Sequence, residues 1–330
     1  MRVAVIGLGA VGARAARQLA STEEVDGVVV RDEHPGRGDV VAASLGRRGM
    51  GERPPYDAVP SVDVAIIATP PGAHAEQARQ FLRQGAAVVS TSDAVADVRG
   101  LLDLQPEATE RGLAVVAGAA FSPGLSCVLA RHAAAGFDAV DEVHVARVGT
   151  GGPACARQHH RALGGTGVDW RDGGWQRRPG GSGRELCWFP DPIGAEDCYR
   201  AALPDGYLLV PAFPGVVRVT ARLGANRRDR FSARLPMLRP PHPEGGPGAV
   251  RAEVRGRRGN GRVVQVLGAM DRPAVAAGAV AALAAVWAGT GRLTRVGAAG
   301  LAELVEPLPF LTELARRGVK AAVFEGLAAS

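Results

Sequence analysis

The sequence predicts an α/β fold whose N-terminal third is a doubly wound parallel sheet. Short, almost wholly apolar segments alternate over this third with stretches of helical periodicity. Strands so apolar have no solvated face, which is typical of a parallel sheet covered by helices on both sides. We expect strands over residues 3–6, 28–30, 62–68, 86–90 and 113–117, and helices over residues 10–20, 73–84 and 98–111.

The sequence changes in character after Pro123. Residues 149–183 are rich in glycine and have little helical periodicity, which indicates a second domain. Alternating apolar residues then predict an antiparallel sheet, and the last part of the chain returns to helical patterns. We expect strands over residues 216–223, 231–235, 249–255 and 262–267, and helices over residues 274–288 and 309–317.

The composition is that of a globular protein of about two domains at roughly 150 residues each. Of the 330 residues, 46% are hydrophobic and 22% are charged. No apolar run reaches the ~20 residues needed to cross a bilayer. Because Met1 leads directly into a strand-like segment, no signal peptide is expected. We therefore expect a cytoplasmic protein that is not bound to a membrane.

The charge and the cysteines argue against nucleic acid and metal as partners. Between Arg218 and Arg262 the sequence has twelve arginines and only three acidic residues. No aromatic residues alternate with these arginines, so a solvated surface or a positive field for an anionic substrate is favoured over nucleic-acid binding. The four cysteines form no C-x-x-C pair, and we expect buried or idle thiols and no metal site. Lys320 is the chain's single lysine. Arginine is a poor base, so histidine, acids, tyrosine, cysteine or Lys320 must transfer protons.

Residues 7–12, Gly-Leu-Gly-Ala-Val-Gly, follow a strand and open a helix. In that context the first glycine permits a tight turn, the second lets the backbone approach a pyrophosphate, and the third allows close helix packing. The helix N-terminus adds free N–H groups and a positive dipole. The pattern predicts a Rossmann dinucleotide site on the backbone of Gly7, Gly9, Ala10, Val11 and Gly12, with a simple glycine turn as the alternative.

An acid follows the second predicted strand. Asp32 lies twenty residues after Gly12, where a carboxylate binds the adenosine ribose hydroxyls, and this favours NAD over NADP. Arg31 and Arg37 oppose that preference. However, Arg31 alternates away from Asp32 along the strand, and Arg37 follows a Pro-Gly pair in a stretch expected to be flexible. We expect NAD, with NADP possible, and the alternative is that Asp32 only caps a loop.

A second loop is expected beside the first. The strand over residues 62–68 ends in Ala68, Thr69, Pro70 and Pro71, and the carboxyl edges of open sheets bind ligands. We expect these residues to line the channel for the ribose and nicotinamide. His74 follows at the start of a helix, where it either contacts the cofactor or is a polar residue without a catalytic role.

Residues 117–126, Ala-Gly-Ala-Ala-Phe-Ser-Pro-Gly-Leu-Ser, resemble the saccharopine dehydrogenase (reductase) family, which carries a similar Gly-Phe-x-Pro-Gly turn before a helix. Diaminopimelate dehydrogenase is similar at the same place. The resemblance continues through residues 189–194, 212–216 and 309–319. The glycine turn and the Pro-Gly turn are its specific parts.

The resemblance implies a Rossmann domain over residues 1–122, an α+β domain for substrate binding and dimerisation over 123–270, and C-terminal helices over 271–330 that pack on the first domain. It implies a homodimer and an NAD(P)-dependent oxidoreductase that acts on a C–N bond of a small amino acid or polyamine-like substrate, through an imine. Phe121, Ser122, Pro123 and Gly124 would then bind the substrate, because amides at a helix start can hold a carboxylate. The alternative is a plain helix start.

The Gfo/Idh/MocA family is a rival, because residues 68–71 and His74 fit its pattern as well. That family uses Glu-Lys-Pro after the next strand, whereas this chain has Ser-Thr-Ser-Asp at residues 90–93. The usual acid of a sugar dehydrogenase is therefore missing. A dinucleotide-binding sensor without turnover is the third possibility, since fold does not imply function.

A polar cluster at residues 157–161 is the candidate for the substrate side. Arg157 could clamp a carboxylate, and His159 or His160 could transfer a proton near neutral pH. The spacing does not place these side chains in a cleft, so surface or structural histidines are the alternative.

Overall fold

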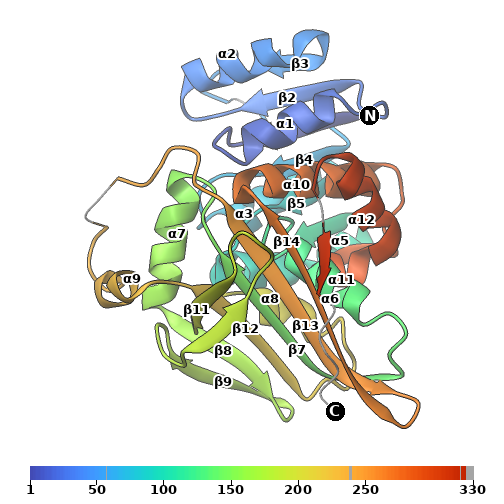
Figure 1. The fold of residues 1–330 in the computed structure, drawn as a ribbon. Helices are drawn as coiled ribbons and strands as arrows, with labels where there is room; N and C mark the ends of the chain where they lie inside the picture. Colours follow the sequence, from blue (N-terminus) through green and yellow to red (C-terminus); the bar gives the residue numbers. More distant parts are fainter. Residues whose placement is uncertain (57, 238–239, 320, 325–330) are drawn as a thin grey trace. The chain divides into compact units, whose positions relative to one another are not determined.

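The computed structural model describes residues 1–56, 58–237, 240–319 and 321–324 (Figure 1). The chain forms two compact units, the first from Met1–Gly124 and Ala274–Glu306 and the second from Leu125–Pro273 and Pro307–Ser330. The segment 271–330, expected to pack as a whole on the first domain, is therefore divided between the two units. Lys320 lies outside the described residues.

The first unit contains a seven-stranded sheet in the order β15-β6-β5-β4-β1-β2-β3, in which all neighbouring strands are parallel. This confirms the predicted doubly wound sheet. The edge strands β3 and β15 escape the sequence analysis because they are short and rich in glycine and alanine. The strands are β1 (Arg2–Ile6), β2 (Gly27–Arg31), β3 (Gly49–Gly51), β4 (Val64–Ile67), β5 (Ala87–Ser90), β6 (Ala114–Ala117) and β15 (Gly297–Gly300).

The helix expected over residues 98–111 is two helices, because a second one begins at Gln105 with Pro106 in its first turn. The predicted helix over 274–288 is confirmed as α10, whose Gly278 lies so close to α1 that an added Cβ would be 2.7 Å from the Arg14 Cβ. No helix in the described part of the chain has the length and apolar character to span a membrane. The helices of this unit are α1 (Gly12–Ala20), α2 (Pro35–Ser44), α3 (His74–Arg83), α4 (Val95–Leu102), α5 (Gln105–Glu110), α10 (Pro273–Gly289) and α11 (Leu301–Leu304), with a 3₁₀ turn at Gly46–Arg48.

The second unit contains a mixed sheet in the order β10-β11-β12-β7-β13-β14-β16, with β8 paired to β12 and β9 paired to β8. It is antiparallel, as predicted, except that β12 and β7 are parallel. The strands are β7 (Ala139–Val148), β8 (Thr166–Arg171), β9 (Gly174–Pro179), β10 (Glu185–Trp188), β11 (Ala195–Tyr199), β12 (Arg218–Gly224), β13 (Gly248–Arg258), β14 (Gly261–Asp271) and β16 (Ala321–Phe324).

Two local expectations for this unit are wrong. The strand expected over residues 231–235 is absent, because Asn226 caps a short helix, α9 (Arg227–Ser232), by accepting a 2.8 Å hydrogen bond from the Asp229 N–H. The glycine-rich stretch expected to lack helix contains α7 (Pro153–Gly164), with its proline in the first turn. The other helices are α6 (Leu125–Ala133), α8 (Asp205–Leu209) and α12 (Pro307–Arg316).

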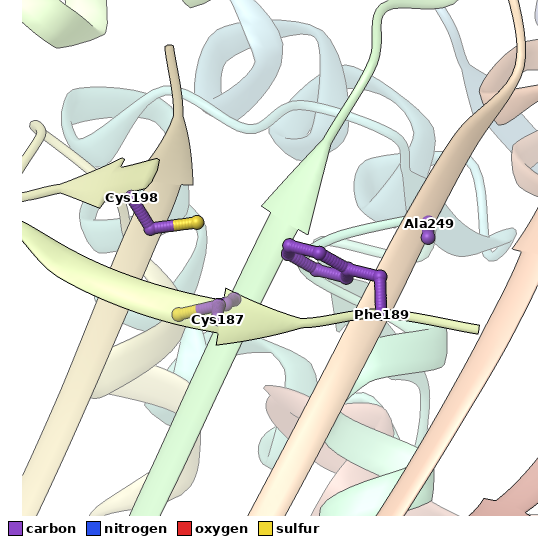
Figure 2. Close-up of a cluster of buried hydrophobic side chains, with 5 residues drawn as sticks. Cys187, Phe189, Cys198 and Ala249 are labelled. Carbon is purple, nitrogen blue, oxygen red and sulfur yellow. The ribbon is translucent and has the colours of Figure 1, made fainter. Parts of the chain in front are cut away.

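The two faces of the second sheet differ in chemistry. Along β7 and β12 one face carries buried apolar side chains such as Val143, Val145 and Leu223, while the other carries Glu142, His144 and Arg222. At one end of the polar face a small apolar cluster forms from Ala146, Cys187, Phe189, Cys198 and Ala249. Figure 2 shows the Phe189 ring between Cys187 and Ala249. The family-like segment at residues 189–194 therefore has a packing role.

Candidate functional site

The turn after β1 uses its three glycines for three different reasons. Gly7 has a φ of +88°, and a Cβ there would lie 2.7 Å from the carbonyl oxygen of Ala68. A Cβ on Gly12 would overlap the carbonyl oxygen of Gly7, so α1 can begin this close to the turn only with glycine. Gly9 is exposed, and a Cβ there would meet nothing within 4 Å. The open space lies where a pyrophosphate approaches the backbone in this motif.

The loop after β4 lies beside this turn. Ile6 and Ile67 are register partners, and Ala68 N–H donates a 2.8 Å hydrogen bond to the Ile6 carbonyl, so the two loops leave the sheet together. Thr69 and Pro71 are half-buried and Pro70 is exposed. Ala10, Val11 and residues 68–71 thus follow two neighbouring strands, β1 and β4, on either side of which the strand order reverses, and such switch points commonly bind ligands.

His74 is fully buried, and both of its ring nitrogens have partners within the protein. Nδ1 lies 2.9 Å from the Ser90 hydroxyl, and Nε2 lies 3.0 Å from the Thr69 carbonyl oxygen. Burial lowers the pKa of His74, although Asp97 acts in the opposite direction. A neutral imidazole thus joins the loop after β4 to the end of β5. These contacts give His74 a structural role between the two segments, and its contact with a cofactor stays a prediction.

Residues that the sequence analysis left without a role support the same loop. Both carboxylate oxygens of Asp97 accept the Gly72 N–H, at 3.1 and 3.0 Å, and one of them also accepts the Ser92 hydroxyl at 2.7 Å. Asp97 is 4% exposed. The serines of the Ser-Thr-Ser-Asp stretch after β5 were the available signal, because small polar residues after a buried strand commonly bind backbone groups of nearby loops.

Asp32 is nearly buried at the end of β2 and is anchored to the glycine turn. Its Oδ2 accepts the Leu8 N–H at 2.7 Å, and its Oδ1 accepts the His34 N–H at 2.9 Å. The Arg37 guanidinium lies 3.2 and 3.3 Å from the two oxygens. The expectation that Arg37 lies in a flexible stretch is wrong, since Arg37 belongs to helix α2, which begins at Pro35.

Arg31 lies away from Asp32, as the strand alternation predicts. Its Nε donates a 2.6 Å hydrogen bond to Glu52, and its guanidinium lies 4.6 Å from the centre of the Tyr56 ring. The Tyr56 hydroxyl in turn bonds the backbone of Asp32. An open hollow of about 440 Å³ adjoins this group and is lined by Arg31, Glu52, Arg53, Pro55, Tyr56, Ala58, Val59 and Pro60.

The Pro-Gly turn is packed rather than open. Phe121 and Ser122 are 5% and 3% exposed, Pro123 and Gly124 are also buried, and the Ser122–Pro123 peptide bond is cis. Gly124 has a φ of +125°, and a Cβ there would overlap the backbone of Ala120. Helix α6 begins at the next residue. A requirement of the fold thus explains this glycine, and contact of the four residues with substrate stays a prediction.

The predicted substrate cluster lies on α7 in the second unit. Arg157 is exposed, whereas His159 and His160 are half-buried. Burial, together with the nearby Arg147, lowers the pKa of His159 to about 3, so its imidazole is neutral at physiological pH. His160 Nε2 lies 2.8 Å from the Leu235 carbonyl oxygen. Arg147, which was not singled out from the sequence, lies near the end of β7, the strand that precedes α7.

Among the described residues, no group of three or more His, Cys, Asp or Glu side chains has a geometry that could hold a metal ion. Cys127, Cys155, Cys187 and Cys198 form no disulfide bond with one another in the described part of the chain.

Comparisons with known proteins agree with this geometry. Residues 1–118 match the Gfo/Idh/MocA model, described as an oxidoreductase family with an NAD-binding Rossmann fold. Apo saccharopine dehydrogenase (L-Glu forming) from Saccharomyces cerevisiae is similar in structure, with a TM-score of 0.68 at 14% identity over 98% of this chain and 99% of that one. An engineered D-amino acid dehydrogenase bound to NADP⁺ has a TM-score of 0.50 at 16% identity over 96% and 99% of the two chains. The comparison with curated proteins finds no match.

At these identities the structural likeness shows the fold, and the matched segment shows what the first unit binds. Residues 1–118 form an NAD-binding Rossmann fold, which confirms the dinucleotide cofactor predicted from the glycine turn. The oxidoreductase family and the dehydrogenase neighbours together support an NAD(P)-dependent dehydrogenase.

Proposed function

We propose that this protein is an NAD(P)-dependent dehydrogenase or reductase that acts on a C–N bond of an amino acid or polyamine-like substrate, by hydride transfer to or from an imine. The observation that carries the proposal is the likeness to saccharopine dehydrogenase over nearly the whole of both chains, combined with the glycine turn of the first unit. A bound nicotinamide supplies the hydride chemistry. The protein's own residues bind, orient and exchange protons.

On the dinucleotide side, the backbone N–H groups at residues 9–12 would hold the pyrophosphate in the open space beside Gly9. Asp32 holds the turn in shape through Leu8, and His74 holds the neighbouring loop through Thr69. The hollow beside Tyr56 would take the adenine, whose flat ring suits an arginine and an aromatic side chain.

On the substrate side, Arg147 and Arg157 supply positive charge for a carboxylate, and His159 or His160 exchanges a proton. Because the pKa of His159 is about 3, its neutral imidazole is too weak a base to take a proton from an ammonium group, so His160 is the better candidate for proton transfer. Backbone amides at the Pro-Gly turn of the first unit are a separate candidate for holding a carboxylate.

Two other functions remain open to test. A Gfo/Idh/MocA-type sugar dehydrogenase is supported by the match over residues 1–118. The stretch at residues 90–93 opposes it, since Ser90 and Ser92 are buried there and bonded to His74 and Asp97, without a lysine to act as the acid. A dinucleotide-binding sensor would keep the same first unit.

We also propose that the protein is cytoplasmic and forms a homodimer. Light scattering of the purified protein tests the homodimer.

A substrate panel separates these functions. Purified protein is mixed with NAD⁺ or NADP⁺ and amino acids, polyamines or polyols, and in the reverse direction with reduced cofactor and pairs of oxo acid and amine. Absorbance of the reduced cofactor at about 340 nm is followed. We expect turnover with an amine-containing substrate. Turnover of polyols alone would establish the sugar-dehydrogenase alternative, and binding of reduced cofactor without any turnover would establish the sensor.

A further inference from the structure

The carboxylate of Asp32 has no acceptor position left for a ribose. Oδ1 accepts from the His34 N–H and from Arg37, and Oδ2 accepts from the Leu8 N–H and from Arg37. A carboxylate offers about four acceptor positions in total. The two backbone donors belong to the turn and to the start of α2, so Arg37 is the one partner whose removal leaves the local backbone bonded.

Arg37 is also the partner that can move. Its side chain is 45% exposed, whereas that of Asp32 is 4% exposed. The other arginine near the turn is held more firmly, because Arg31 is 13% exposed, is paired with Glu52 and lies over Tyr56. Glu33 is 78% exposed and pairs with His34, so it adds negative charge next to Asp32.

We propose that Arg37 sets the choice between NAD and NADP by competing with the dinucleotide for Asp32. With NAD, the ribose hydroxyls would replace the guanidinium on the carboxylate. With NADP, the 2′-phosphate would pair with that guanidinium, which offers several N–H donors in a fork. The free Asp32 carboxylate repels the phosphate, and Arg37 offsets this repulsion, so the wild-type protein accepts both cofactors within about tenfold of each other.

The inference rests on the proposed dinucleotide site and is tested by binding, without any substrate. The dissociation constants of NADH and NADPH are measured by fluorescence titration for the wild-type protein and for Arg37→Gln. We expect NADPH binding to weaken at least tenfold in Arg37→Gln and NADH binding to stay the same or strengthen. A merely structural role for Arg37 would move both constants together and leave their ratio unchanged.

Arg79→Gln is the matched control. The Arg79 side chain is 44% exposed, close to the 45% of Arg37, and it pairs with Glu107. We expect the NADPH to NADH ratio to stay within about twofold of wild type in this variant. Salt provides a second readout, because raising ionic strength should weaken NADPH more than NADH in the wild-type protein and should lose this difference in Arg37→Gln.

Should Arg37→Gln fail to fold, Arg37→Lys keeps the charge without the fork and is expected to shift the ratio part of the way. An unchanged ratio in a folded variant that binds both cofactors would overturn the role of Arg37 and leave the proposed function intact. Wild-type protein that binds neither dinucleotide would overturn both.

Discussion

The two sheets of this protein place their polar residues in opposite ways. In the seven-stranded sheet the strands are buried and almost wholly apolar, and polar side chains such as Asp32, Ser90 and Ser92 lie at the carboxyl ends. In the second sheet charged residues lie along the strands themselves, and Glu142 and Arg222 share one face. Arg222 is 4% exposed and bonds Asp169 and Glu185 from other strands.

The difference shows where each unit can carry function. A parallel sheet covered on both faces leaves only its loops free, so we expect its ligand site at the turn after β1 and the loops beside it. The second sheet can hold charge in its interior only as pairs, because an isolated buried charge is costly. Substitutions in the two sheets should therefore fail for different reasons.

The largest loss of stability is expected for a substitution at Gly124, where the first segment of the first unit ends. Gly124→Ala places a Cβ against the backbone of Ala120 at a φ of +125°, and we expect a loss of about 3–5 kcal/mol of unfolding free energy, or failure to fold. Urea denaturation measures it. Gly112→Ala is the control, since its φ of +65° has open space around it and should cost about 1 kcal/mol. Equal effects of the two variants would contradict the packing argument.

In the second sheet the largest effect should come from a buried charge. Asp169→Asn leaves Arg222 without its bidentate partner, whose contacts are 2.8 and 3.2 Å, and should cost about 3 kcal/mol in unfolding free energy. Asp172→Asn removes an exposed partner of Arg171 on the adjoining turn and should cost under about 1 kcal/mol. If both substitutions are equally mild in denaturation curves, the pairs on the polar face do not stabilise the sheet.

Buried histidines give the second unit a pH dependence. Burial lowers the pKa of His159 to about 3 and also lowers the pKa of His144. The unfolded chain then binds more protons than the folded one below about pH 6.5, so stability is full above that pH and falls as the pH decreases. His159 alone should lower the unfolding free energy by up to about 2 kcal/mol as the pH falls from 6.5 to 5.

His159→Gln tests this slope, with His34→Gln as the control because His34 is 62% exposed. We expect the unfolding free energy of His159→Gln to fall less steeply over this pH range, and that of His34→Gln to follow wild type. A wild-type stability that is flat between pH 7 and 5 would contradict a neutral His159.

The smallest change in stability is expected for Gly9→Ala, which tests whether the turn after β1 binds the dinucleotide. A Cβ there meets nothing within 4 Å in the protein, so the melting temperature should stay near wild type while dinucleotide affinity falls about tenfold. Gly36→Ala, which is equally open, should leave the affinity unchanged. If calorimetry finds normal dinucleotide affinity in Gly9→Ala, the pyrophosphate does not bind at this turn.

Much of the first unit could be predicted from the sequence because its signals are local. Apolar runs of a few residues predict β1, β2, β4, β5 and β6, and the spacing of Gly7, Gly9 and Gly12 after the first of them predicts the dinucleotide turn. The same local patterns predict α1, α3 and α10. They fail at the glycine-rich edge strands β3 and β15, because these residues have low β-propensity and form strands only by pairing with the neighbouring strand.

Tertiary structure alone decided the rest. The pairing of Arg37 with Asp32 depends on the helix that begins at Pro35, and the contact of Asp169 with Arg222 joins residues 53 positions apart. The neutral state of His159 depends on burial and on Arg147 from another element. A charge, a pKa and a buried ion pair are set by what lies within a few ångströms in space, and sequence spacing does not contain that distance.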